Sequence, residues 1–274
     1  MQMKNVVVVR GGGDIATGII HRLHNAGYSV LVLETAHPSA IRREVSFSEA
    51  VYDGEKMVER VTCRRAENLS AAKKIIKAGD VALIVDESGS ILKESFHPRI
   101  LIDAILAKRN MGTDFSMADF IIGIGPGFCG GKDVHCVIET MRGHNLGRLI
   151  YEGRAMRDTG VPGAIAGVST ERVIHASAAG RIENERTISS VVKKDEIIAE
   201  IFAEDGTMTE VRANITGILR GIIRNGYEVT EGLKIADVDP RSEEQENCFT
   251  ISDKSRCISG SVLEAVLAWE RKMR

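Results

Sequence analysis

The stretch that decides the fold is Val6-Val7-Val8-Val9-Arg10-Gly11-Gly12-Gly13-Asp14-Ile15-Ala16-Thr17-Gly18, near the start of the chain. Its four β-branched residues favour a buried strand. Three glycines then permit a tight turn, and apolar residues at helical spacing follow. A second apolar run, from Ser29 to Leu33, ends at Glu34. The order strand, helix, strand within about thirty residues predicts a right-handed βαβ unit.

The glycine turn is the first candidate ligand site. Gly11, Gly12 and Gly13 stand where a helix begins, and a helix N-terminus presents unpaired N–H groups and a partial positive charge to an anion. Glu34 ends the next strand, where a carboxylate can accept a ribose hydroxyl. We therefore expect these residues, with Asp14, to hold a nucleotide or another phosphate-bearing ligand. The alternative is an ordinary βαβ turn that binds nothing.

The pattern of strands and helices continues beyond this unit. Asn68 and Gly79 bound a predicted helix, an apolar strand follows at residues 81–85, and Pro98 is expected to open a helix running to about Lys108. Another strand is expected at residues 120–124. Strands that alternate with helices predict an α/β fold with a doubly wound, Rossmann-like parallel sheet.

A second glycine-rich loop follows the strand at residues 120–124. It supplies four further candidate ligand contacts, namely Gly125, Gly127, Gly131 and Lys132. The loop departs from the phosphate-binding P-loop pattern at two positions, so ATPase chemistry is excluded. Cys129 and Lys132 are weak candidates for a catalytic role, because a thiol near a lysine can be activated. The alternative is that Cys129 is an incidental small residue in a tight turn.

Composition narrows the class of protein. The 274 residues carry a formal net charge of −2, so no basic surface points to nucleic acid or to a membrane. No apolar run is long enough to span a bilayer, and residues 1–5 leave no room for a signal peptide. Five scattered cysteines without a Cys-x-x-Cys pair predict free thiols, no metal site and a reducing, cytoplasmic location.

The second half of the chain contains an internal repeat at an offset of 37 residues. Gly180 pairs with Gly217, and Ile182 pairs with Leu219. Two such β-rich copies resemble the barrel-sandwich hybrid of biotinyl and lipoyl domains, although the hairpin tip at residues 203–207 lacks the carrier lysine. We therefore expect three parts: a Rossmann-like domain at 1–165, a barrel-sandwich-hybrid-like domain at 166–242, and a terminal segment at 243–274 whose helix packs on the first domain.

Several blocks together resemble the YqeB-type accessory proteins of the selenium-dependent molybdenum hydroxylase system, and more distantly the XdhC/CoxI group. The blocks are residues 10–18, 125–128, 133–135, 137–140, 142–144, 237–241, 251–254 and 262–265. The resemblance implies a maturation protein with a molybdenum hydroxylase as partner. The ligand would be a molybdopterin-type cofactor or a (di)nucleotide. It supplies no catalytic residues, so enzymatic activity and oligomeric state, including a homo-oligomer, stay open.

Two other functions compete with cofactor maturation. The βαβ unit and Glu34 are compatible with an NAD(P)-dependent oxidoreductase, but no recognisable proton-transfer group follows them. A non-catalytic scaffold that docks to the hydroxylase through the repeat is the other alternative.

Overall fold

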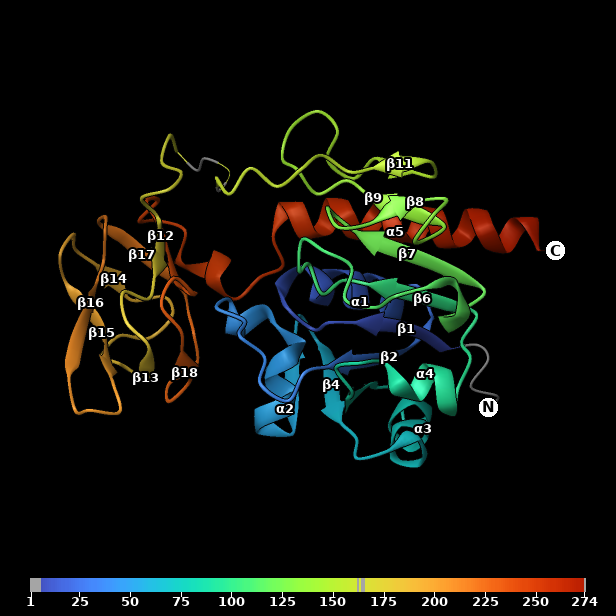
Figure 1. The fold of residues 1–274 in the computed structure, drawn as a ribbon, viewed down its shortest axis with the longest axis horizontal. Coiled ribbons are helices and arrows are strands. Elements are labelled where there is room, and N and C mark those ends of the chain that lie inside the picture. The colour runs from blue at the N-terminus through green and yellow to red at the C-terminus, as the bar shows by residue number, and fades with distance from the viewer. Residues whose placement is uncertain (1–5, 162, 164–165, 274) are drawn as a thin grey trace. The chain divides into compact units, whose positions relative to one another are not determined.

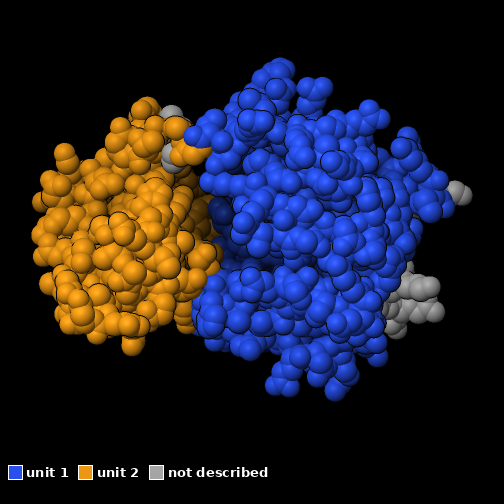
Figure 2. Space-filling model, viewed as in Figure 1, with its two compact units in different colours: residues 1–38, 46–159, 251–274 blue, residues 39–45, 160–250 orange. Residues whose placement is uncertain are grey.

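The computed structural model describes residues 6–161, 163 and 166–273. Residues 1–5, which bear on the prediction that there is no signal peptide, lie outside this range. The predicted domain boundary at residue 165 lies outside it as well. The chain divides into two compact units, which Figure 2 shows in different colours. Unit 1 comprises residues 1–38, 46–159 and 251–274, and unit 2 comprises residues 39–45 and 160–250.

Unit 1 is built on a nine-stranded mixed sheet with the strand order β10-β9-β7-β6-β1-β2-β5-β4-β3. The seven inner strands are parallel, while β3 and β10 pair antiparallel at the two edges. Nearly every residue of the central strands is buried, as a parallel sheet covered on both faces requires. The strands are β1 Val6–Arg10, β2 Ser29–Glu34, β3 Glu55–Val58, β4 Val61–Arg65, β5 Val81–Val85, β6 Ile100–Asp103, β7 Phe120–Ile124, β9 Cys136–Ile138 and β10 Leu149–Ile150. A separate pair is formed by β8 Cys129–Gly130 and β11 Gly153–Arg154.

The helices of unit 1 are unevenly distributed along the chain. They are α1 Asp14–Asn25, α2 Ala50–Asp53, α3 Leu69–Lys77, α4 Ser90–Glu94 and α5 Asp253–Lys272, with single 3₁₀ turns at η3 Phe47–Glu49 and η4 Phe115–Met117. The connections from β6 to β7 and from β7 to β9 contain no α-helix. Instead α5, from the end of the chain, runs beside α1 and packs against β9 (Figure 1).

The predicted helix that opens at Pro98 is wrong. Residues 100–103 form β6, which lies in the sheet between β1 and β7. The run Ile100-Leu101-Ile102 is buried on both faces of the sheet, and such short apolar runs do not distinguish a strand from a buried helix by periodicity.

Unit 2 contains two four-stranded antiparallel sheets, with the orders β12-β19-β17-β14 and β16-β15-β13-β18. Its strands are β12 Val173–His175, β13 Gly180–Asn184, β14 Val191–Val192, β15 Ile197–Phe202, β16 Met208–Arg212, β17 Gly217–Ile222, β18 Glu228–Val229 and β19 Lys234–Asp239. Two 3₁₀ turns, η2 Arg43–Val45 and η5 Gln245–Cys248, complete it.

The repeat is visible in these strands, because β13, β14 and β15 begin 37 residues before β17, β18 and β19. The copies exchange partners: β13 pairs with β18, and β17 pairs with β14. Ile182 and Leu219, which occupy equivalent positions, are both fully buried.

The expected combination of a Rossmann-like domain with a lipoyl-like barrel-sandwich hybrid is wrong. The sheet of unit 1 is mixed rather than doubly wound, because antiparallel strands close both edges and the crossovers of its second half lack helices. The second unit is two separate antiparallel sheets. In the described part of the chain, no helix combines the length and the apolarity needed to cross a bilayer.

Candidate functional site

In the glycine turn after β1, backbone atoms of other segments occupy the space beside the first two glycines. Gly11 has φ +95°, and a Cβ there would lie 2.8 Å from the carbonyl oxygen of Ala104. A Cβ on Gly12 would lie 2.9 Å from the amide nitrogen of Ser48. That amide donates to the Gly12 carbonyl oxygen over 2.8 Å. These glycines therefore let two loops approach β1 closely, which explains them without a ligand.

Glu34 also contacts the turn rather than solvent. One carboxylate oxygen accepts the N–H of Gly12 at 2.6 Å, and the other accepts the N–H of Thr35 at 2.8 Å. Burial raises the pKa of Glu34, and the charge of Glu87 acts in the same direction, while the two backbone hydrogen bonds oppose them. The carboxylate that was expected to hold a ribose is thus engaged in closing the turn.

Gly13 and the first turn of α1 form the open part of the turn. A Cβ on Gly13 would meet no heavy atom within 4 Å. Gly13 is the N-cap of α1 and supplies no side-chain cap. Among the described residues, none accepts a hydrogen bond from the backbone N–H of Gly13, Ile15 or Ala16. The backbone N–H groups of this turn that have no acceptor among the described residues therefore lie at its helical end.

The glycines of the second loop are likewise required by close approaches within unit 1. Gly125, Gly127 and Gly131 all have positive φ. A Cβ on Gly125 would lie 2.8 Å from Thr140 Oγ1, and one on Gly127 would lie 2.7 Å from the Arg109 amide nitrogen. Packing within unit 1 therefore explains these glycines.

Cys129 and Lys132, the weak catalytic candidates, lie in the β8 turn. The backbone N–H of Cys129 donates to Asp133 Oδ2 at 2.9 Å, and its half-buried sulfur lies 3.8 Å from the Gly130 carbonyl oxygen. Lys132 is exposed. All five cysteines are free thiols. The described residues contain no group of three or more His, Cys, Asp or Glu that could hold a metal ion.

A lysine that the sequence analysis did not single out lies beside the open end of α1. Lys254 is in the first turn of α5, and the hydroxyl of the next residue, Ser255, donates to the Asp14 carbonyl oxygen at 3.2 Å. Burial lowers the pKa of Lys254, and the charge of Arg142 lowers it further, whereas Asp14 and Glu139 oppose the shift. A cation is unfavourable at a helix N-terminus. That unusual position is the sequence signal that could have identified Lys254.

The carboxylates and the arginine around Lys254 are held in place by specific bonds. Glu139, at the end of β9, is 2 % exposed, and its two oxygens accept the N–H groups of Met141 at 2.7 Å and Met156 at 2.8 Å. Arg142 forms a bidentate pair with Asp253, at 2.8 and 3.0 Å. The Lys254 site, defined as Lys254 with the first turn of α1, therefore has a rigid polar border.

Comparison with known proteins supports the predicted resemblance by sequence. The chain is 46% identical over 263 residues to a protein of Escherichia coli (strain K12) described as "Uncharacterized protein YqeB". The match covers 96% of this chain and 47% of that protein, so the chain spans about half the length of its relative. No protein-family model matches the chain. The relative carries no described function, and neither the XdhC/CoxI link nor a selenium role is supported.

Three solved structures resemble the chain at low identity. They are the product-bound ectoine utilization protein EutE (DoeB) of Ruegeria pomeroyi (11% identity, 85% of this chain, 57% of that chain, TM-score 0.26), an aspartoacylase family protein of Mesorhizobium loti (8%, 85%, 56%, 0.24) and a succinylglutamate desuccinylase of Silicibacter sp. TM1040 (12%, 86%, 84%, 0.27). At these TM-scores, the likeness carries no inference about the chemistry of this chain.

The expected function is not supported by these findings. The structures found bear the names of desuccinylases, aspartoacylases and EutE, and not of molybdenum hydroxylase accessory proteins. Maturation of a molybdenum hydroxylase, that enzyme as partner, and the molybdopterin or dinucleotide ligand are therefore withdrawn. The contacts of Gly11, Gly12 and Glu34 within unit 1 give no support to an NAD(P)-dependent oxidoreductase, and the hydroxylase-docking scaffold is withdrawn together with its partner.

Proposed function

We propose that unit 1 binds a small molecule through a carboxylate group at the Lys254 site. The observation that supports this proposal is the half-buried Lys254 beside the N-terminal end of α1. There the N–H groups of Gly13, Ile15 and Ala16 have no acceptor among the residues that the structure describes. A carboxylate there would accept hydrogen bonds from these N–H groups and form an ion pair with the partly desolvated lysine. Charge-assisted hydrogen bonds of this kind are stronger than hydrogen bonds between neutral groups.

The charges around the site favour a single negative charge on the ligand. Asp14 and Glu139 already act on Lys254, and Asp253 pairs with Arg142. A group with two negative charges would face these carboxylates at short range, where like charges repel strongly. A monocarboxylate is therefore the better match.

Substitution of Lys254 by Met tests this proposal, since Met keeps the stem and removes the charge. We expect acetate and longer monocarboxylates to shift the amide NMR signals of Gly13, Ile15 and Ala16 in the unaltered protein. Loss of one charge-assisted bond, worth about 1.5–3 kcal/mol, should weaken binding at least about tenfold in Lys254→Met.

Lys272→Met is the matched control, because Lys272 lies in the last turn of the same helix and is exposed. It should leave the affinity unchanged. Unchanged affinity in Lys254→Met, or the absence of any shift at the three amides with every carboxylate tried, would refute the proposal. Affinity should also decline as pH rises, at lower pH than for an ordinary lysine, because the pKa of Lys254 is lowered.

A further inference from the structure

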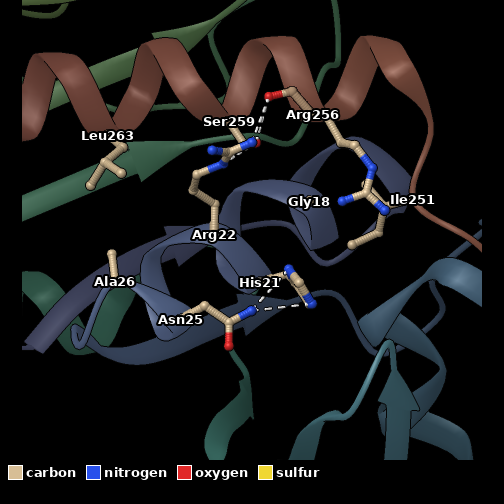
Figure 3. Close-up of a pocket in the computed structure, with 9 residues that line it drawn as sticks. All are labelled: Gly18, His21, Arg22, Asn25, Ala26, Ile251, Arg256, Ser259 and Leu263. Carbon is tan, nitrogen blue, oxygen red and sulfur yellow. Dashed lines mark hydrogen bonds between the residues drawn. The ribbon is translucent and has the colours of Figure 1, made fainter.

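A groove separates α1 and α5 on the surface of unit 1, with a volume of about 400 Å³ (Figure 3). The two helices run parallel, since Ser255 contacts Asp14 and Tyr28 contacts Glu270 at the other end. The α1–α5 groove is lined by Gly18, His21, Arg22, Asn25, Ala26, Ile251, Arg256, Ser259 and Leu263. Its volume is in the range of small-molecule sites.

The charge of the groove is positive. Arg22 and Arg256 line it from opposite helices, together with His21, and no lining residue carries a carboxylate. Arg256 is partly neutralised, because it donates to Glu59 Oε1 at 2.6 Å. The same carboxylate lies 3.8 Å from His21 Nε2.

Arg22 is positioned without being neutralised. Its Nε donates to Ser259 Oγ at 3.1 Å, and its Nη2 donates to the Arg256 carbonyl oxygen at 3.4 Å. No carboxylate of the described residues lies within ion-pair distance of Arg22. Two neutral acceptors thus fix a guanidinium that retains its charge, as in a site prepared for an anion.

We infer that the α1–α5 groove is a binding site for a small dicarboxylate, separate from the Lys254 site. One carboxylate would bind the guanidinium of Arg22, and the other would approach Arg256 and His21. Ala26 and Leu263, which also line the groove, provide apolar surface for the hydrocarbon between the two groups. Because Arg22 and Arg256 line the groove from opposite helices, a ligand with two separated carboxylates matches the groove better than a ligand with one carboxylate.

The test uses succinate as the probe and the Lys254→Met protein as the background, so that the first site is disabled. Succinate should shift the amide NMR signals of residues 18–26 and 256–263, and should bind at least about tenfold more tightly than acetate, because a second ion pair forms. Asn25→Asp places a carboxylate in the groove at nearly constant shape. We expect it to weaken succinate binding at least about fivefold through like-charge repulsion.

Asn68→Asp is the control for the charge change. Asn68 is the N-cap of α3, where Asp is equally suitable, and it does not line the groove. Succinate affinity should be unchanged in this variant. The inference is overturned if succinate shifts only the amides of Gly13, Ile15 and Ala16, if acetate binds the groove as tightly as succinate, or if Asn25→Asp has no effect. Because the two sites report through different amides, failure of one proposal is distinguished from failure of the other.

Discussion

At the scale of single residues, Glu34 shows that a local pattern can predict a position without predicting its contacts. Its predicted position at the end of β2, beside the glycine turn, is confirmed. Its partners are the N–H groups of Gly12 and Thr35, which use two of the roughly four acceptor positions of a carboxylate. These contacts hold the turn in place, and the sequence pattern alone does not show them.

The raised pKa of Glu34 predicts a specific pH dependence of stability. The unfolded value is 4.5, and the folded value is higher, because burial disfavours the charged form. The folded state therefore binds more protons, so the free energy of unfolding that Glu34 contributes falls as pH rises from 4.5 through the folded pKa. Urea denaturation of the unaltered protein and of Glu34→Gln between pH 4.5 and 7 should show their difference in stability shifting in favour of Glu34→Gln as pH rises.

Titration of the other groups affects the unaltered protein and Glu34→Gln alike, so it cancels in the difference between their free energies of unfolding. The direction in which this difference changes with pH therefore tests the prediction. A stability difference that moves in favour of the unaltered protein with rising pH would show that the two N–H bonds outweigh burial. In that event the Glu34 carboxylate would have a folded pKa below 4.5.

The residues of the candidate site differ in how far they could be predicted. Gly13 and Asp14 follow from the local pattern, because a turn and a helix start within a few residues of each other. Lys254 could not be placed there, since it is 240 residues away and only the packing of α5 beside α1 brings it near Asp14. Gly11 is predicted as a ligand contact, but in the structure a glycine is needed there because the backbone of Ala104 lies too close for a side chain.

At the scale of elements, the two copies of the repeat in unit 2 have a glycine at equivalent close approaches of the backbone. A Cβ on Gly180 would lie 2.3 Å from the carbonyl oxygen of Phe202, and a Cβ on Gly217 would lie 2.2 Å from that of Asp239. Phe202 and Asp239 are themselves 37 residues apart. Gly217→Ala forces a backbone movement at a point where β17 and β19 pair, so we expect a loss of about 1–3 kcal/mol in the free energy of unfolding.

Thermal and urea unfolding of Gly217→Ala measure this loss. Gly260→Ala is the control, because a Cβ at Gly260, within α5, meets no heavy atom within 4 Å. Alanine there should be neutral or stabilising by up to about 1 kcal/mol. A Gly217→Ala protein as stable as the unaltered one would mean that the close approach to Asp239 relaxes without cost.

Local sequence patterns located most elements of the first half but not all. Residues 29–33 and 81–85 form strands as predicted, and Asn68 caps α3 by accepting the N–H of Ala71 at 3.0 Å. Residues 98–108 were predicted as a helix, and β6 forms there instead. Neighbouring strands decide that difference, since β6 completes the parallel pairing between β1 and β7.

At the scale of the whole molecule, the chain crosses between its units in a way that local patterns do not reveal. Residues 39–45 belong to unit 2, although the residues before and after them belong to unit 1. The predicted domain at 1–165 assigned this segment to the first domain. Instead Arg42 is 7 % exposed, and Ile41 packs against the hydrophobic core of unit 2.

Arg42 therefore predicts a stability effect confined to one unit. Its Nη2 donates to the carbonyl oxygens of Asn247 at 2.9 Å and Thr250 at 3.2 Å, all within unit 2. Arg42→Met removes both bonds and leaves two carbonyl groups without this donor, which should cost about 2–3 kcal/mol. Amide hydrogen exchange should accelerate in the core strands of unit 2, while α1 and the sheet of unit 1 keep their protection.

Arg212→Met is the control, because it removes an exposed arginine of the same unit and shows whether the loss of an arginine alone changes hydrogen exchange. Arg212 is exposed and pairs with Glu210, and exposed pairs contribute about 0–1 kcal/mol. Exchange in unit 2 should therefore change little in that control. Faster exchange in both units of Arg42→Met would mean that the two units unfold as one cooperative body. Unchanged exchange in unit 2 would mean that residues 39–45 contribute no stability to it. Selective acceleration is expected because the Arg42 guanidinium donates to two carbonyl oxygens of unit 2.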